Sequence, residues 1–280
     1  MIIDLNRYKK TKQLVLFDTG DVRDHCSLKR TEVTMTQKIN GVDTIVGTIF
    51  EKKQNKVILP GAEFSAQQHF DIPRDFITPS YNTALELENS VVETPSSEEK
   101  VYLFCLGTDG CGVQNSDVYN EDYSKWIAPE YLVPFRYVKP GDDLSGSLRE
   151  MYFGRKVDRE NERIAYYFKA FETDPVCSKQ YVDGTPIDST IYTNAKTDEV
   201  ETVVTLSLKV LAEDCRDWFN QTTGINDARV NTISLCYAWA KTYDGQIYYQ
   251  DIRPLTKLNF PNEPLIDLTK ELDITYALFY

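Results

Sequence analysis

Cysteine and histidine are the residue types that most readily bind metals or act as nucleophiles, and their spacing here suits neither role. The two histidines, His25 and His69, lie far apart in the sequence. Five residues separate Cys105 from Cys111, which is not the Cys-x-x-Cys spacing of a zinc ribbon. His25 precedes Cys26 directly, but neighbouring residues of a strand point to opposite faces and do not form a catalytic pair. We therefore expect no metal centre and no cofactor.

The chain contains six cysteines, a number that would allow three disulfides in a secreted protein. Cys105 and Cys236, however, lie in apolar stretches with the pattern of strands. No apolar segment with a cleavage site follows the first twelve residues, so we expect no secretory signal. The sequence thus favours reduced cysteines that pack as small hydrophobic side chains.

A glycine-rich segment, Gly107-Thr-Asp-Gly-Cys-Gly112, follows an apolar stretch and must be tested as a phosphate-binding loop. It lacks the Gly-Lys-Ser/Thr ending of a Walker loop. Its glycines also do not follow the Gly-x-Gly-x-x-Gly order of a dinucleotide loop. We interpret it as a tight loop with backbone positions of positive φ rather than as a nucleotide site.

Paired carboxylates could support glycoside hydrolysis, but their abundance here carries no information. With 43 acidic residues, some pair of carboxylates is inevitable. A hydrolase needs two carboxyl groups about 5 to 9 Å apart in a cleft, which a sequence cannot reveal. We therefore predict no catalytic residues and no enzymatic activity, and keep a glycan hydrolase as the enzymatic alternative.

Composition excludes further classes of protein. The net charge of −12 argues against a general nucleic-acid binder, which needs basic residues to neutralise phosphates. No run of about 18 apolar residues predicts a membrane span. Hydrophobic residues make up 41% of the chain, enough for a sizeable core, and the 18 tyrosines favour strands and wet interfaces.

Several segments are predicted to form the elements that position these residues. Residues 45–50 and 56–59 are expected to form a hairpin, because a short polar run separates them. Residues 101–106 and 164–171 indicate strands, and residues 144–153 a short helix that starts near Asp143 or Ser145. The segment 126–138 contains aromatic residues and two prolines, so it is expected to be extended.

The last third shows the clearest strand patterns. Residues 204, 206, 208 and 210 are apolar and alternate with polar residues, as do the apolar residues 272–280. Residues 229–240 predict another strand, and Asp244-Gly245 predicts a tight hairpin turn after it. The segment between residues 211 and 228, with Cys215 and Trp218-Phe219, is interpreted as a loop.

These patterns predict a mainly β protein of the antiparallel β-sandwich type, with few short helices and long loops. We place a loop-rich, β-rich region at residues 1–140 and a β-sandwich domain at 141–280. The boundary is placed at the turn Lys139-Pro-Gly-Asp-Asp143.

Four segments of residues 201–280 form a recognisable series: Leu-Ser-Leu-Lys-Val-Leu at 206–211, the Trp218-Phe219 pair before Gly224, Val-Asn-Thr-Ile-Ser-Leu at 230–235, and Tyr-Tyr-Gln-Asp-Ile-Arg-Pro at 248–254. In this series residues 201–280 resemble the β-sandwich wedge subunit of the baseplates of T4-like contractile-tailed phages. The acidic closing strand at 267–279 is a further similarity. Residues 1–140 look like a general structural protein of tailed phages. The resemblance implies a non-enzymatic, assembling protein of the virion that is made in the bacterial host cytoplasm.

We therefore expect a structural subunit of a tailed-phage virion, in the baseplate wedge or the tail assembly. Its partners would be other phage structural proteins, in a homodimer or another symmetric assembly, with no nucleic acid and no membrane. Two alternatives stay open: a protein of the neck or head, and a carbohydrate-binding β-sandwich with an exposed Trp126 or Trp218. Aromatic anchors carry much of the energy of interfaces. The candidate interface residues are Trp126, Tyr131, Phe135, Tyr137, Trp218, Phe219, Tyr248, Tyr249 and Arg253.

Overall fold

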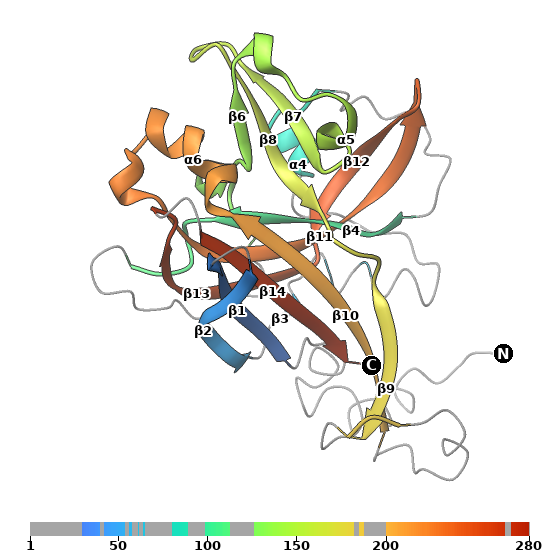
Figure 1. Ribbon diagram of the computed structural model, residues 1–280. Helices are drawn as coiled ribbons and strands as arrows, with labels where there is room; N and C mark the ends of the chain where they lie inside the picture. The colour runs from blue at the N-terminus through green and yellow to red at the C-terminus, as the bar shows by residue number, and fades with distance from the viewer. Residues whose placement is uncertain are drawn as a thin grey trace, which may run out of the picture.

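Two antiparallel sheets and a few short helices make up the described part of the chain, which confirms the mainly β prediction (Figure 1). The computed structural model describes residues 30–39, 42–53, 56–57, 61, 64, 80–88, 99–112, 126–181, 185–187, 200–266 and 270–279. Both histidines and Cys26 lie outside these residues.

The smaller sheet has five strands in the order β2-β1-β14-β10-β9. Its strands are β1 (Arg30–Ile39), β2 (Val42–Lys53), β9 (Val176–Tyr181), β10 (Val200–Leu211) and β14 (Lys270–Phe279). The closing strand β14 pairs with β1 on one side and β10 on the other, so the C-terminal segment occupies the centre of the sheet. Leu206, Leu208 and Val210 are buried, as the period-two pattern predicts.

The larger sheet has nine strands, six of them in the order β3-β13-β11-β4-β8-β6. The first five in the chain are β3 (Lys56–Val57), β4 (Glu99–Gly107), β5 (Leu132–Val133), β6 (Arg136–Val138) and β7 (Tyr152–Asp158). The others are β8 (Arg163–Ala170), β11 (Arg229–Tyr243), β12 (Gln246–Pro254) and β13 (Thr256–Pro264). Strands β5, β7 and β12 pair with β4, β8 and β11.

The helices in the described part of the chain are short. The α-helices are α4 (Tyr81–Ala84), α5 (Gly146–Arg149) and α6 (Ala212–Gln221), and the 3-10 turns are η2 (Pro129–Tyr131), η3 (Pro140–Asp142) and η5 (Ile225–Asp227). Helix α5 begins after Ser145 and is shorter than predicted, because β7 already starts at Tyr152.

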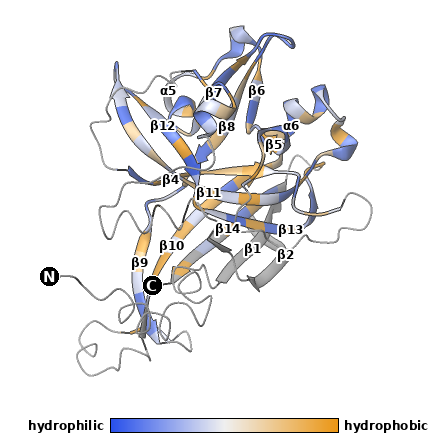
Figure 2. Ribbon diagram, turned by 180° about the vertical axis from the view of Figure 1, so that it is seen from behind, coloured by the Kyte–Doolittle hydropathy of each residue, from blue (hydrophilic) through white to orange (hydrophobic). Residues whose placement is uncertain are grey.

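The two sheets share one hydrophobic core, and the larger sheet buries its other face as well. Leu208 and Ile274 of the smaller sheet pack in one cluster with Phe104 and Leu235 of the larger one. Hydrophobic residues follow β10, β4 and β11 where the layers meet (Figure 2). The opposite face of β4, including Cys105, packs in a second cluster under α4. Strand β4 is therefore buried on both faces, as its continuous apolar run indicates.

Three expectations about the elements differ from the structure, and the first concerns the hairpin at residues 45–59. Strand β2 pairs with β1, whereas β3 pairs with β13 of the other sheet. The hairpin prediction is therefore wrong, and the chain crosses from one sheet to the other between these strands. A short polar run marks a change of direction, but it does not reveal which strand becomes the partner.

The second difference is the segment with Cys215 and Trp218-Phe219, which forms α6 and not a loop. Ala212, Cys215 and Phe219 are buried at spacings of three and four residues, the repeat of one helix face. The helix ends where the Gly224 N–H donates to the Phe219 carbonyl, and Gly224 adopts φ 91°.

The third difference is the boundary near residue 140. Strand β1 pairs with β14, and β4 pairs with β11 and β8. Segments from before and after residue 140 therefore hydrogen-bond within both sheets, and the boundary does not separate one sheet from the other.

A buried ion pair joins the larger sheet to α6. The Lys169 Nζ in β8 lies 3.2 Å from the Asp214 Oδ2 in α6, and the two side chains are 3% and 1% exposed. The Tyr152 hydroxyl donates to Asp214 Oδ1 at 2.7 Å, and the Arg136 guanidinium lies 3.5 Å from the same oxygen. Lys169 also donates to the Lys209 carbonyl of β10 at 2.8 Å, so one cluster connects both sheets and the helix.

We predict that Asp214→Ala lowers the free energy of unfolding by about 3–5 kcal/mol, because it leaves the Lys169 ammonium without its buried partner. Urea or guanidinium denaturation measures the change. Glu213→Ala is the matched control, since Glu213 is exposed in the same first turn, and it should cost less than about 1 kcal/mol. Equal losses in the two variants would contradict the role of the ion pair. The double variant Lys169→Met with Asp214→Leu removes both charges and should recover much of the loss.

Candidate interaction site

The tip of the β11–β12 hairpin exposes apolar side chains. Asp244 and Gly245 adopt φ values of 48° and 74°, and Tyr243 pairs with Gln246 across the turn. Two central residues of positive φ define a type I′ turn, which the Asp-Gly pair predicts. On either side of the turn, Tyr243 is 69% exposed and Ile247 is 46% exposed.

A groove separates this hairpin tip from α5. It has a volume of about 250 Å³ and is lined by Gly146, Arg149, Glu150, Phe153, Gly245, Gln246 and Ile247. Leu148 of α5, next to the lining residue Arg149, is 50% exposed. Of the seven large apolar side chains that are exposed in the described residues, Leu148, Tyr243 and Ile247 belong to these two elements. Of these three residues Ile247 lines the groove, whereas Leu148 is the sequence neighbour of the lining residue Arg149 and Tyr243 pairs with the lining residue Gln246. We call the groove together with these three exposed side chains the hairpin groove.

Arg149 of α5 contacts aromatic side chains of the hairpin and of the larger sheet. Its guanidinium lies 5.7 Å from the Phe153 ring centroid, 5.3 Å from that of Tyr166 and 5.8 Å from that of Tyr248. It also donates a hydrogen bond to the Tyr152 carbonyl at 2.7 Å. A cation among three aromatic faces is well stabilised when it is shielded from water, and Arg149 is only 9% exposed. The groove is therefore a fixed feature of the surface.

A second polar cluster supports the segment before α5. Asp143 Oδ2 accepts hydrogen bonds from Arg155 Nε at 3.0 Å and from another guanidinium nitrogen at 2.8 Å, while Oδ1 accepts from the Tyr166 hydroxyl at 2.6 Å. Arg155 also pairs with Glu88. Partial burial alone would raise the pKa of Asp143, but the hydrogen bonds from Arg155 and Tyr166 outweigh it and lower the pKa below the ordinary value. Burial and the bond to Asp143 raise the pKa of Tyr166 to about 12.

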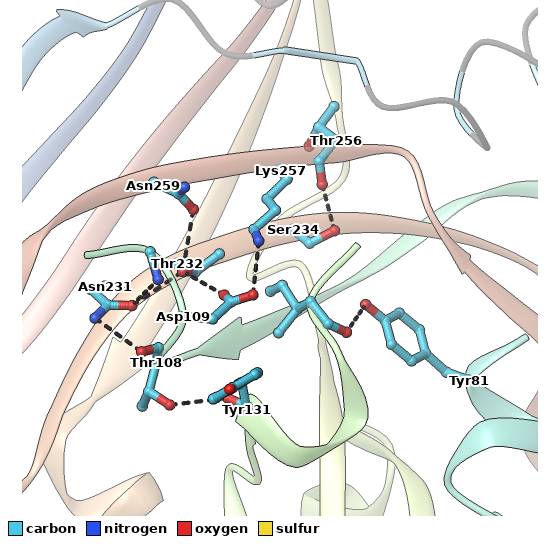
Figure 3. Close-up of polar contacts among 12 residues, drawn as sticks. Tyr81, Thr108, Asp109, Tyr131, Asn231, Thr232, Ser234, Thr256, Lys257 and Asn259 are labelled. Carbon is cyan, nitrogen blue, oxygen red and sulfur yellow. Dashed lines mark hydrogen bonds and ion pairs between the residues drawn. The ribbon is translucent and has the colours of Figure 1, made fainter. Parts of the chain in front are cut away.

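The glycine-rich segment is held by a third polar network (Figure 3). Asp109 accepts hydrogen bonds from Lys257 Nζ at 2.8 Å and from the Thr232 hydroxyl at 3.0 Å. The Gly110 N–H donates to Asn231 Oδ1 at 2.7 Å, and Asn231 Nδ2 donates to the Thr108 carbonyl at 3.2 Å. The loop is thus fixed onto β11 and β13 by buried polar groups.

Gly107 and Gly110 do not adopt positive φ, so that part of the loop prediction is wrong. Glycine is needed at 110 for a different reason: a Cβ there would collide with the Asn231 carbonyl oxygen and the Thr232 hydroxyl. Close approach of two backbones requires glycine just as a positive φ does.

Four of the nine predicted interface residues are buried in the protein itself. Phe135 is fully buried, and Phe219 is 2% exposed. Tyr137 is 5% exposed, and its hydroxyl donates to Asp158 Oδ2 at 2.6 Å. Arg253 is 7% exposed and pairs with Asp251 at 2.9 Å. In the isolated chain these four residues are packed inside the protein and do not form an exposed interface.

The other five predicted residues keep some exposed surface. Trp126 stacks on Tyr81 with 4.6 Å between ring centroids, and Tyr131 is 46% exposed. Tyr249 packs against Phe153 at 4.6 Å. The remaining two are Tyr248, which lies beside Arg149, and Trp218, which lines a separate pocket. The structure does not bring the nine residues together into one site.

The residues that sequence analysis missed are Leu148, Tyr243 and Ile247. A signal for two of them was present, because the Asp244-Gly245 turn places the flanking residues at the tip of a hairpin. Exposed apolar side chains that gather in one region of the surface can mark a contact site.

Three further features of the described residues concern metal ligands, thiols and membrane spans. No group of three or more His, Cys, Asp or Glu side chains among them is placed to hold a metal ion. The five cysteines in this part of the chain have free thiols, and Cys105 Sγ lies 3.8 Å from Cys236 Sγ. In the same residues, no helix has both the length and the hydrophobicity needed to cross a bilayer.

Comparison with protein-family models, with curated proteins and with solved structures finds no match for this chain.

We predict that Asp143→Asn makes the stability of the protein less dependent on pH in the acid range. Because the pKa of Asp143 is lower in the folded state, its contribution is present above the unfolded value of about 3.9 and is lost as the pH falls through the folded value. Asp143 is partly exposed, so the loss at pH 7 should be about 1 kcal/mol, and the difference between the variant and the original chain should shrink as the pH falls below about 3.9. Urea titrations at several pH values test this. Asp142→Asn, at the exposed neighbouring residue, should leave the profile unchanged.

We also predict that Gly110→Ala lowers the free energy of unfolding by about 1–3 kcal/mol, because the added methyl group must displace backbone of β11. Gly141→Ala is the matched control, since a Cβ there meets nothing within 4 Å. The control should change stability by less than about 0.5 kcal/mol. Thermal unfolding of both variants, followed by circular dichroism, decides the point, and similar melting temperatures would contradict the close-approach argument.

Proposed function

We propose that this protein is a structural subunit of a tailed-phage virion, in the baseplate wedge or the tail, and that it acts through contacts with other virion proteins. The observation that carries the contact role is the hairpin groove. Leu148, Tyr243 and Ile247 expose about half or more of their surface on two adjoining elements. Exposed apolar side chains around a groove are typical of protein–protein contact sites. The resemblance of residues 201–280 to wedge subunits supports the assignment to the virion.

Charge favours a different protein over a second copy as the partner at the hairpin groove. The chain has a net charge of −12, so two copies repel each other unless counterions screen them. A neighbouring subunit with basic residues around an apolar projection would complement both the exposed side chains and the overall charge. A role in the neck or head uses the same kind of contact and differs only in position in the particle.

Mass spectrometry of purified particles of the phage that encodes this chain tests the assignment, with heads and tails separated. Peptides of the chain in the tail fraction, at a multiple of three or six copies, are the expected result. Peptides confined to heads would leave a structural role and remove the wedge assignment. Absence from both fractions would overturn the proposal.

We predict that the double variant Tyr243→Ser with Ile247→Ser fails to enter particles, with at least tenfold lower incorporation when it is supplied in trans to a phage lacking the gene. The variant removes the two exposed apolar side chains of the hairpin tip, of which Ile247 lines the groove, and both contribute little to folding. Ile266→Ser is the matched control, since Ile266 is 48% exposed and does not line the groove. Normal incorporation of the double variant would show that the groove is not the contact surface.

A further inference from the structure

A second pocket lies at the other end of β11, beside α6. It has a volume of about 290 Å³ and is lined by Thr108, Trp218, Phe219, Thr223, Asp227 and Arg229. This volume is close to the lower limit of about 300 Å³ for small-molecule sites, so a ligand must be as small as a single ring. These residues come from three segments: the end of β4, helix α6 with the turn after it, and the start of β11. We call them the Trp218 pocket.

The aromatic wall of the pocket is held in place by the core. Trp218 is partly exposed, and its ring meets the buried Phe219 ring edge-on, with 4.9 Å between centroids and 73° between planes. The Trp218 carbonyl accepts hydrogen bonds from the Thr222 N–H at 3.0 Å and from the Thr222 hydroxyl at 2.8 Å, which fix the end of α6. The indole therefore presents a preorganised apolar surface, which lowers the entropic cost of binding.

The rest of the rim is polar and carries both charges. The Asp227 carboxylate is 66% exposed, and its Oδ1 lies 3.9 Å from the Arg229 guanidinium, at the outer limit of an ion pair. The Thr108 hydroxyl donates to the Tyr131 carbonyl at 3.4 Å and keeps its oxygen lone pairs as acceptors. The buried network of Asp109 and Asn231 fixes the backbone on either side of this threonine. The rim thus offers a strong acceptor, a strong donor and hydroxyl groups next to the aromatic wall.

From this combination we propose that the Trp218 pocket binds a neutral pyranose ring of a glycan. One face of a pyranose consists of C–H groups that pack on an aromatic ring, and its edge carries hydroxyl groups that donate and accept hydrogen bonds. An anionic ligand would meet the Asp227 carboxylate, and a cationic ligand would meet the Arg229 guanidinium. A wholly apolar ligand would remove water from both charged groups without offering hydrogen bonds in place of the water. A neutral polyol with one apolar face satisfies every part of the pocket.

The first test is a glycan array probed with the full-length chain and with Trp218→Ala. We expect binding to a group of neutral glycans that share one terminal pyranose, and at least tenfold weaker signal with Trp218→Ala. Calorimetry with the best-bound oligosaccharide should then show a Kd at least ten times higher for the variant. Asp227→Ala changes only an exposed side chain and should also weaken binding, which keeps the test valid if Trp218→Ala does not fold.

The control is Tyr243→Ser, which removes an aromatic side chain that is more exposed than Trp218. Tyr243 lies fourteen residues along β11 from Arg229, at most about 46 Å at the rise of a strand. Its glycan binding should be unchanged, whereas its assembly should be impaired, so the two proposals can fail separately. No glycan bound on the array would overturn the proposal, and so would equal binding by Trp218→Ala and Asp227→Ala.

Discussion

The buried contact between Lys169 and Asp214 is the point on which both sheets and α6 depend. Lys169 reaches Asp214 from β8 and also donates to the Lys209 carbonyl in β10, so one ammonium group bridges the layers. Two charges at this depth are tolerated only when their hydrogen-bonding capacity is filled, and Tyr152 and Arg136 supply the remaining donors to the carboxylate. Burial and the neighbouring Asp214 charge raise the pKa of Tyr152, so its hydroxyl remains a donor. The arrangement fixes the orientation of α6, and with it the position of Trp218.

Two other polar clusters hold loop segments in place, as this ion pair holds the two sheets and α6 together. Asp143 with Arg155 and Tyr166 fixes the segment before α5, and Asp109 with Lys257 fixes the segment after β4. Each cluster lies directly behind one of the two proposed binding surfaces. Loops positioned by buried hydrogen bonds lose little freedom when a partner binds, which lowers the cost of association. The acidic residues that make the net charge so negative are in part used to build these supports.

The sequence predicts those features of the fold that depend on local patterns, and it does not predict pairing between strands that are distant in the chain. Alternation along residues 204–210 and 272–278 identifies β10 and β14 and the faces they bury, and Asp244-Gly245 identifies the hairpin turn. The partner of β3 was missed because pairing is decided by strands distant in the chain. Helix α6 was missed although its apolar residues have helical spacing, because only three of its ten residues face the core as apolar groups. The polar clusters combine residues as distant as Asp109 and Lys257, a juxtaposition that only the folded sheets create.

Strand β11 runs from one of the two proposed binding surfaces to the other. It is the longest described strand, it pairs with β4, β12 and β13, and its core residues are almost all fully buried. Its first residue lines the Trp218 pocket, and its last forms the tip of the hairpin beside the groove. The pairing of β11 with its neighbours shifts register at several points, but the two surfaces still lie at opposite ends of the strand, fourteen residues apart. A subunit anchored in an assembly at the hairpin groove would therefore keep the Trp218 pocket clear of that contact, and the same chain could be held by a neighbour and bind a glycan at once.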